Sequence, residues 1–225
     1  MGELLSLTGH RHRRERSGAF GTRHARTTFF FDLADPGTYF AAERVDRLFP
    51  GVRWAPAWLP FDRWPGEEEI EARSAALGMP LVWPDRYPAP RRIAMRAALH
   101  ACDLGRGAPF ALAATRLAFC GGFDLDDPEV LAEASAAAGL ELDACLHAAG
   151  DDTLDERMNE AGRKLMAAGV EWLPAVQIGG RVFEGEERLA EAAAARRAAM
   201  TPVRELRHHE SGGMAPRVVQ MTNRA

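Results

Sequence analysis

The sequence pattern that most clearly indicates the fold of this chain is TTFFFDLADPGTYFAAERV, residues 27–45. It opens with a run of β-branched and aromatic side chains at 27–34, which is typical of a central strand covered on both faces. Asp35-Pro36 follows at once, and these residue types suit the N-cap and the first position of a helix. An apolar stripe at helical spacing then predicts a helix that ends near Gly51. The stripe comprises Thr38, Ala41, Ala42, Val45, Leu48 and Phe49.

A second strand is predicted at 52–59 (VRWAPAWL). Pro56 within it has no N–H to donate, which restricts this strand to a sheet edge or a bulge. The strand, helix and strand together make a βαβ unit, whose crossover is expected to be right-handed.

The β pattern returns only after about a hundred residues of helical pattern. Two short runs, WLPAVQI at 172–178 and RVFE at 181–184, flank Gly179-Gly180, and this arrangement predicts a hairpin with a two-residue turn. A last helix is expected from Glu186. Within the helical stretch, Asp127-Pro128 repeats the cap pattern of Asp35-Pro36.

This order predicts an α/β protein in which helices are inserted between the two β-containing halves. We expect a flexible basic arm and a flexible tail at the two ends, since both lack an apolar period. The expected segments are the arm at 1–26, the βαβ half at 27–66, an inserted helical domain at 67–169, the ββα half at 170–200 and the tail at 201–225.

Composition excludes several classes of function. Of the 225 residues, 47% are apolar and 27% charged, which is a globular composition, and the net charge of −4 argues against a nucleic-acid partner. No apolar run is long enough to span a membrane. The three cysteines lie far apart, so no CxxC or metal pair can be drawn, and their odd number without a signal peptide predicts a cytoplasmic protein with no metal.

Three segments carry a resemblance to a known family. FFFDLADPGTYFAAERV (29–45), GMPLVWPDRYPAPRR (78–92) and WLPAVQIGGRVFEGEERL (172–189) resemble 2-hydroxychromene-2-carboxylate isomerases and kappa-class glutathione transferases, within the DsbA-like group. The resemblance covers about residues 27–195. It implies a thioredoxin-like fold with an all-helical insertion, and it also makes a homodimer an expectation.

The same resemblance implies a site for glutathione or another low-molecular-weight thiol. Leu173-Pro174 matches the family's cis-proline corner, so the backbone of Leu173 is expected to pair with an extended, peptide-like thiol. Tyr39 fills an aromatic position of the family motif. The segment expected to hold the γ-glutamyl end comprises Glu186, Glu187 and Arg188.

The chain departs from the family at the catalytic position. The family has a serine before the proline, and its redox relatives have a cysteine, whereas this chain has Asp35, with Thr38 as the nearest hydroxyl. A carboxylate at a helix N-terminus is expected to stay ionised, and beside a thiol it would disfavour the thiolate. Asp35 could instead act as a general base or orient a cationic or hydroxylic ligand.

Each of these residues also has a purely structural interpretation. Asp35 can be a cap only, Thr38 a buried stripe residue, and Glu186 and Glu187 acids that suit the first turn of a helix. Arg188 can be solvated or paired on the surface.

Three functions therefore follow from the sequence. The first is an isomerase or transferase that acts on a small aromatic or thiol-conjugated substrate, with Asp35, Thr38 and Tyr39 as its catalytic groups. The second is a ligand-binding module without catalysis. The third, a disulfide oxidoreductase, is disfavoured because both motif cysteines are missing.

Overall fold

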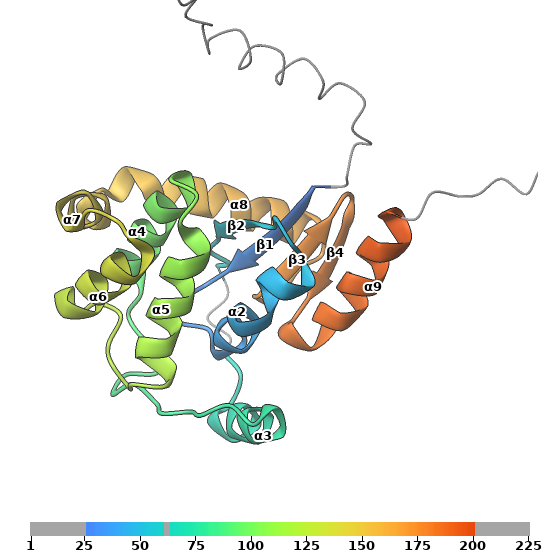
Figure 1. Ribbon diagram of the computed structural model, residues 1–225, viewed down its shortest axis with the longest axis horizontal. Helices are drawn as coiled ribbons and strands as arrows, with labels where there is room; N and C mark the ends of the chain where they lie inside the picture. The colour runs from blue at the N-terminus through green and yellow to red at the C-terminus, as the bar shows by residue number, and fades with distance from the viewer. Residues whose placement is uncertain (1–25, 61–63, 201–225) are drawn as a thin grey trace, which may run out of the picture.

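The computed structural model describes residues 26–60 and 64–200. The predicted arm, apart from Arg26, and the predicted tail lie outside the described residues. Along the described chain, helices surround a sheet whose strands come from both ends of the sequence (Figure 1).

A four-stranded mixed sheet lies at the centre, in the order β2–β1–β3–β4. β1 pairs in parallel with β2 and antiparallel with β3, which pairs antiparallel with β4. The first strand is therefore central and the second lies at an edge, as the sequence predicts, although both are shorter than expected. The strands are β1 (Thr27–Phe31), β2 (Arg53–Pro56), β3 (Ala175–Ile178) and β4 (Arg181–Glu184).

The two faces of the sheet are covered by different helices (Figure 1). One face packs against α2 (Pro36–Leu48) and α9 (Leu189–Met200), and the buried rings of Phe29 and Phe31 belong to this core. Phe30 points to the other face, because side chains alternate along a strand. There it packs beside Leu165 of α8 (Asp155–Ala167).

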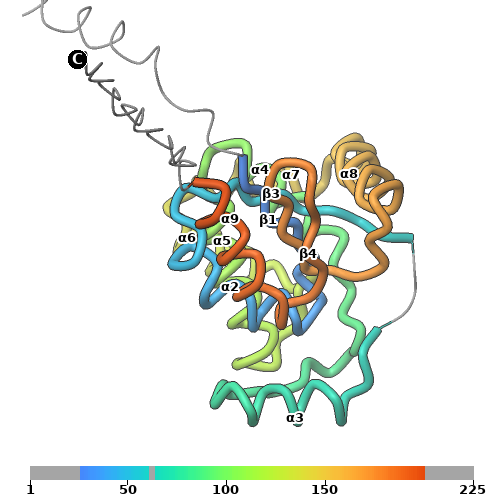
Figure 2. Tube along the Cα trace, turned by 90° about the vertical axis from the view of Figure 1, so that its right-hand side faces the viewer, coloured from blue at the N-terminus to red at the C-terminus, as the bar shows by residue number. Residues whose placement is uncertain are grey.

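The remaining helices form a block beside the sheet, and this block shares one hydrophobic core with it. Phe110 and Val130 of the block belong to the same buried cluster as Phe29. Helix α3 stands apart from the others, below the sheet in both views (Figures 1 and 2). These helices are α3 (Glu67–Leu77), α4 (Arg92–Asp103), α5 (Gly107–Phe119), α6 (Pro128–Ala138) and α7 (Leu142–Gly150).

Helix α8 lies within the segment 67–169 that is predicted as the inserted helical domain, and it also covers one face of the sheet. The N–H of Trp58 donates to the carbonyl of Met158 over 3.2 Å. At Gly162 a Cβ atom would lie 1.7 Å from the Trp58 carbonyl oxygen, so only glycine allows the helix to come this close.

The last predicted helix begins with a short 3₁₀ turn, η3 (Glu186–Arg188), that leads into α9. A similar turn, η2 (Asp152–Leu154), precedes α8. None of the helices in the described part of the chain is long and apolar enough to cross a membrane.

Candidate functional site

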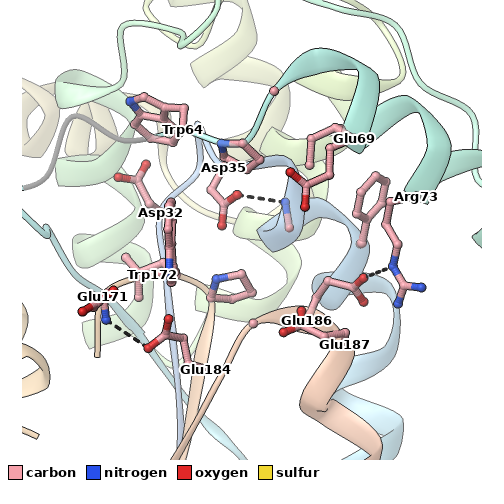
Figure 3. A pocket seen from close by; sticks show the side chains of 18 of the residues that line it. Asp32, Asp35, Trp64, Glu69, Arg73, Glu171, Trp172, Glu184, Glu186 and Glu187 are labelled. Carbon is pink, nitrogen blue, oxygen red and sulfur yellow. Dashed lines mark hydrogen bonds and ion pairs between the residues drawn. The ribbon is translucent and has the colours of Figure 1, made fainter. Parts of the chain in front are cut away.

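A cavity of about 820 Å³ lies where the start of α2, helix α3 and the segments on either side of the β3–β4 hairpin meet (Figure 3). Its wall combines carboxylates with apolar side chains, including Phe40, Ile70 and Trp172. A volume of this size suits a small organic ligand. The cavity contains Asp35 and Leu173-Pro174, which the sequence places more than a hundred residues apart.

Asp35 is the N-cap of α2 and is almost fully buried, at 5% exposure. Its Oδ1 accepts a hydrogen bond of 2.9 Å from the N–H of Gly37, and its Oδ2 accepts one of 3.3 Å from the hydroxyl of Thr38. Burial and, to a smaller extent, the nearby Asp32 nevertheless raise the pKa of Asp35 to about 8, against the opposing effect of the Gly37 N–H. The expectation that Asp35 stays readily ionised is therefore wrong, because desolvation outweighs the helix terminus.

A second buried carboxyl, Asp32, lies beside Asp35 and was missed by the sequence analysis. It is 3% exposed, accepts from the Ala34 N–H over 3.0 Å, and forms an ion pair of 2.6 Å with Nε of Arg91. Burial raises the pKa of Asp32, and the guanidinium of Arg91 opposes this shift. The only signal in the sequence was an acidic residue at the end of an apolar strand.

Pro174 packs directly against the first turn of α2. The Leu173–Pro174 peptide bond is cis, and the Pro174 carbonyl accepts from the Gly185 N–H over 2.8 Å. A Cβ atom added at Gly37 would lie 3.0 Å from Cδ of Pro174, so the absence of a side chain at Gly37 leaves room for this contact. The acid and the prolyl corner therefore form one wall of the cavity.

Glu186 lines the cavity but is already paired. Its buried carboxylate bridges Arg44 of α2 and Arg73 of α3 by short ion pairs. Of the side chains of α3, only those of Ile70 and Ser74 are buried, so this bridge is a main attachment of the helix. Neighbouring Glu187 also lines the cavity and is exposed.

Tyr39 and Arg188 lie outside the cavity wall, and Thr38 lies beneath it. The Tyr39 hydroxyl donates to the Pro80 carbonyl over 2.9 Å and lies 3.0 Å from Sγ of Cys120. Arg188 pairs with Glu191 at 2.8 Å. Thr38 is fully buried, and its hydroxyl donates to Asp35 while accepting from the N–H of Asp32 over 3.4 Å. Thr38 thus supports Asp35 from below.

The charge of the cavity wall is strongly acidic. Seven carboxyl groups and two guanidinium groups line it. The guanidinium groups belong to Arg73 and Arg91. The carboxyl groups belong to Asp32, Asp35, Glu69, Glu171, Glu184, Glu186 and Glu187 (Figure 3). No three His, Cys, Asp or Glu side chains among residues 26–60 and 64–200 are arranged to hold a metal ion.

Comparisons with known proteins identify the fold. No family model and no curated protein sequence matches the chain. A solved 2-hydroxychromene-2-carboxylate isomerase superposes with a TM-score of 0.63 and 19% identity, covering 76% of this chain and 95% of its own. A probable DsbA oxidoreductase from Streptomyces coelicolor gives 0.59 and 19%, covering 80% and 93%.

A third structure is the cytosolic disulfide reductase DsbM from Pseudomonas aeruginosa with GSH. It gives a TM-score of 0.59 and 15% identity, covering 77% of this chain and 96% of its own. The protein therefore has a thioredoxin-like fold similar to that of these three structures, and the predicted fold class is confirmed.

Proposed function

We propose that this protein is an enzyme of the isomerase or transferase type that binds a small organic molecule and uses Asp35 as its acid–base group. The observation that supports the proposal best is the position of Asp35, a buried carboxyl on the wall of a large cavity, next to the cis-proline corner. In the family that the sequence resembles, the catalytic serine occupies this position.

The chemistry of Asp35 fits that role. A carboxyl whose pKa is about 8 is mostly protonated at neutral pH, yet its ionised form is still accessible. General acid–base catalysis is most efficient when the pKa of the group lies near the working pH. Asp35 can therefore donate a proton, or a hydrogen bond that a serine hydroxyl would otherwise supply, and take the proton back later. Thr38 holds the carboxyl in place from beneath.

Glutathione fits the charge of this cavity poorly. The tripeptide carries a net negative charge, and the cavity wall has a large excess of carboxylates. Of the segment predicted to hold its γ-glutamyl end, Glu186 is engaged by two arginines and Arg188 pairs elsewhere. We derive no catalytic step through glutathione. A bound low-molecular-weight thiol, glutathione or another, stays a prediction, as do a homodimer and a cytoplasmic location.

A ligand-binding module without catalysis is the second candidate. The absence of a serine or cysteine at the position of Asp35 favours it, since a buried aspartate can serve as a cap alone. Disulfide exchange has less support, because it needs a thiolate at the site. None of Cys102, Cys120 and Cys145 lines the cavity, and burial raises the pKa of Cys102 to about 12. We expect no reduction of insulin.

The deciding experiment separates binding from conversion. A panel of small aromatic carbonyl, hydroxyl and amine compounds, each with and without a low-molecular-weight thiol, is screened by ligand-observed NMR. Compounds that bind are then incubated with the protein, and their conversion is followed by proton NMR. Ligand at 100 times its dissociation constant should also stabilise the fold by about 2.7 kcal/mol.

Two variants complete the experiment. We expect Asp35→Asn to bind the same compounds but convert them about a hundredfold or more slowly, since that is the usual contribution of a general acid–base group. Asp127→Asn, at the matching position of α6, should convert them at the wild-type rate. Binding without conversion by the wild type would favour the binding module. Full activity of Asp35→Asn would exclude the proposed role of Asp35.

A further inference from the structure

The carboxylates of the cavity differ in whether a cation of the protein compensates them. Asp32 has Arg91, and Glu186 has Arg44 and Arg73. Four others form no ion pair within residues 26–60 and 64–200, and they come from different sides of the cavity. These are Glu69 of α3, Glu171 before the cis-proline corner, Glu184 at the end of β4 and Glu187 of η3.

Both arginines of the cavity wall already pair with a carboxylate through Nε. Arg73 pairs with Glu186 across the gap between α3 and the β4–α9 turn. Arg91 pairs with Asp32, and its guanidinium lies 4.8 Å from the ring centroid of Trp64. An anion that enters would therefore lose its hydration next to several carboxylates, while each guanidinium among the described lining residues already compensates one of those carboxylates.

Asp35 adds a second observation, deeper in the cavity. Its carboxyl is almost fully buried, and within the described residues its hydrogen-bond partners are a backbone N–H and a hydroxyl rather than a cation. A buried carboxyl without a counter-ion is costly to ionise, and a cationic ligand group beside it would remove that cost. The apolar side chains of Leu59, Phe40 and Trp172 offer a surface for the organic part of such a ligand.

We propose that the cavity selects small organic cations, such as primary amines with an aromatic or aliphatic body, over their neutral and anionic analogues. The inference names the substrate class of the site that the proposed function describes, and it rests on that function. The ligand's cationic group would lie among Asp35, Glu69 and Glu187.

The test uses three probes of one size and three charges: benzylamine, benzyl alcohol and benzoate. Their dissociation constants are measured by isothermal titration calorimetry on the full chain at neutral pH. We expect benzylamine to bind about tenfold more tightly than benzyl alcohol, because several exposed or half-exposed carboxylates each contribute a small factor. Benzoate should bind most weakly. The preference should shrink as salt rises from about 0.02 to 0.5 M, while the affinity for benzyl alcohol stays constant.

Two variants assign the preference to the cavity. The double variant Glu69→Gln, Glu187→Gln should weaken benzylamine binding by about fivefold and leave benzyl alcohol unchanged. Glu133→Gln, which removes an exposed carboxylate of α6, is the matched control and should change neither.

The outcomes distinguish this inference from the proposed function. Benzoate that binds as tightly as benzylamine, benzylamine that fails to bind at millimolar concentration, or a double variant with unchanged affinity would each overturn the charge preference. The proposed function would still stand if another compound of the panel were converted in a manner that depends on Asp35. Tight binding of benzylamine, with no compound of the panel converted, would support the cation preference and count against the enzyme.

Discussion

Two helices of this protein begin with the same dipeptide, Asp35-Pro36 in α2 and Asp127-Pro128 in α6. Both aspartates have an extended backbone, and each accepts a hydrogen bond from the N–H two residues on, at 2.9 Å from Gly37 and at 2.8 Å from Glu129. The environments differ. Asp127 is exposed, whereas Asp35 is buried on the cavity wall that Pro174 also lines. The local geometry is thus nearly identical, and only the tertiary surroundings separate the two.

Helix capping therefore explains why an aspartate stands at position 35, but it does not explain why that aspartate is buried. An exposed aspartate already satisfies the helix end, as Asp127 does, with no desolvation cost. Burying the same group costs free energy unless a cation compensates it. Asp35 is nevertheless buried without a compensating cation among the described residues, and it lies at the helix start that lines the cavity. This is why we assign function to Asp35 and only structure to Asp127.

The largest expected effect is the pH dependence of stability that Asp35 produces. Between its unfolded pKa of about 4 and its folded pKa of about 8, the folded state holds the extra proton. The free energy of unfolding should therefore fall as the pH rises from about 4 to 8 and then level off. Asp35→Asn keeps an acceptor for the Gly37 N–H but cannot ionise. We expect it to exceed the wild type by a few kcal/mol at pH about 9 and to approach it below pH about 4.

Urea denaturation at a series of pH values measures this effect. Asp127→Asn is the control, and it should follow the wild-type profile throughout. Parallel profiles for the wild type and Asp35→Asn would show that the two aspartates are equivalent and that burial does not raise the pKa of Asp35.

Asp35→Ala and Asp127→Ala should lower the free energy of unfolding by different amounts, and this difference should be smaller than the pH effect. Asp127→Ala loses an exposed cap, and we expect a cost of about 1 kcal/mol. Asp35→Ala also leaves the Gly37 N–H and the Thr38 hydroxyl without an acceptor in a buried place, and we expect about 2–3 kcal/mol near pH 5. Thermal and urea unfolding at that pH check the difference. Equal costs would mean that the Asp35 carboxyl does no more than cap its helix.

Much of the fold could be predicted from local patterns. The βαβ unit, the edge position that Pro56 imposes and the two-residue hairpin turn follow from side-chain period and turn chemistry, which act within a few residues. The placement of α8 could not be predicted this way. An amphipathic pattern shows that a helix has a buried side, but not which face of a sheet it covers. Gly162, which allows the close approach, looks in the sequence like any helical glycine.

The sequence predicted those residues of the candidate site that belong to a recognisable family motif. The structure brings Asp35, Leu173-Pro174, Glu186 and Glu187 to one cavity. It does not bring Tyr39 there, because successive residues of a helix point in directions about 100° apart. The Asp32–Arg91 pair joins residues 59 positions apart, and no local pattern indicates such a contact. The raised pKa of Asp35 was also missed, since the sequence does not tell how completely a cap is buried.

The two helix starts also differ at the residue directly after the proline. Gly37 follows Pro36 where Glu129 follows Pro128. Gly37→Ala gains helix propensity but crowds Pro174, since the new methyl would lie 3.0 Å from its Cδ. Overpacking of this kind outweighs the propensity gain, and we expect a net loss of about 1 kcal/mol. Glu129→Ala, at an exposed position, should change stability by less than about 0.5 kcal/mol. A stabilised Gly37→Ala would mean that the prolyl corner does not press on α2.

The smallest expected effect lies at Thr38, which aligns with Val130 of α6. Thr38→Val makes the start of α2 more like that of α6. It removes the hydroxyl that donates to Oδ2 of Asp35 over 3.3 Å and accepts from the N–H of Asp32 over 3.4 Å. Both bonds are long, so we expect a loss of only about 0.5 kcal/mol. The bond to Asp35 also favours the ionised carboxyl and lowers its pKa, so without it the midpoint of the stability profile should move to higher pH.

Thr115→Val separates the two consequences of the Thr38 change. Thr115 is equally buried, and its hydroxyl donates to the Ala111 carbonyl over 2.8 Å, within α5 and away from the cavity wall. This variant should lose a similar amount of stability and keep the wild-type midpoint, because no carboxyl depends on its hydroxyl. A midpoint that moves equally in both variants, or in neither, would mean that Thr38 does not set the protonation of Asp35. Burial, Asp32 and the Gly37 N–H would then account for the pKa of Asp35 without the Thr38 hydroxyl.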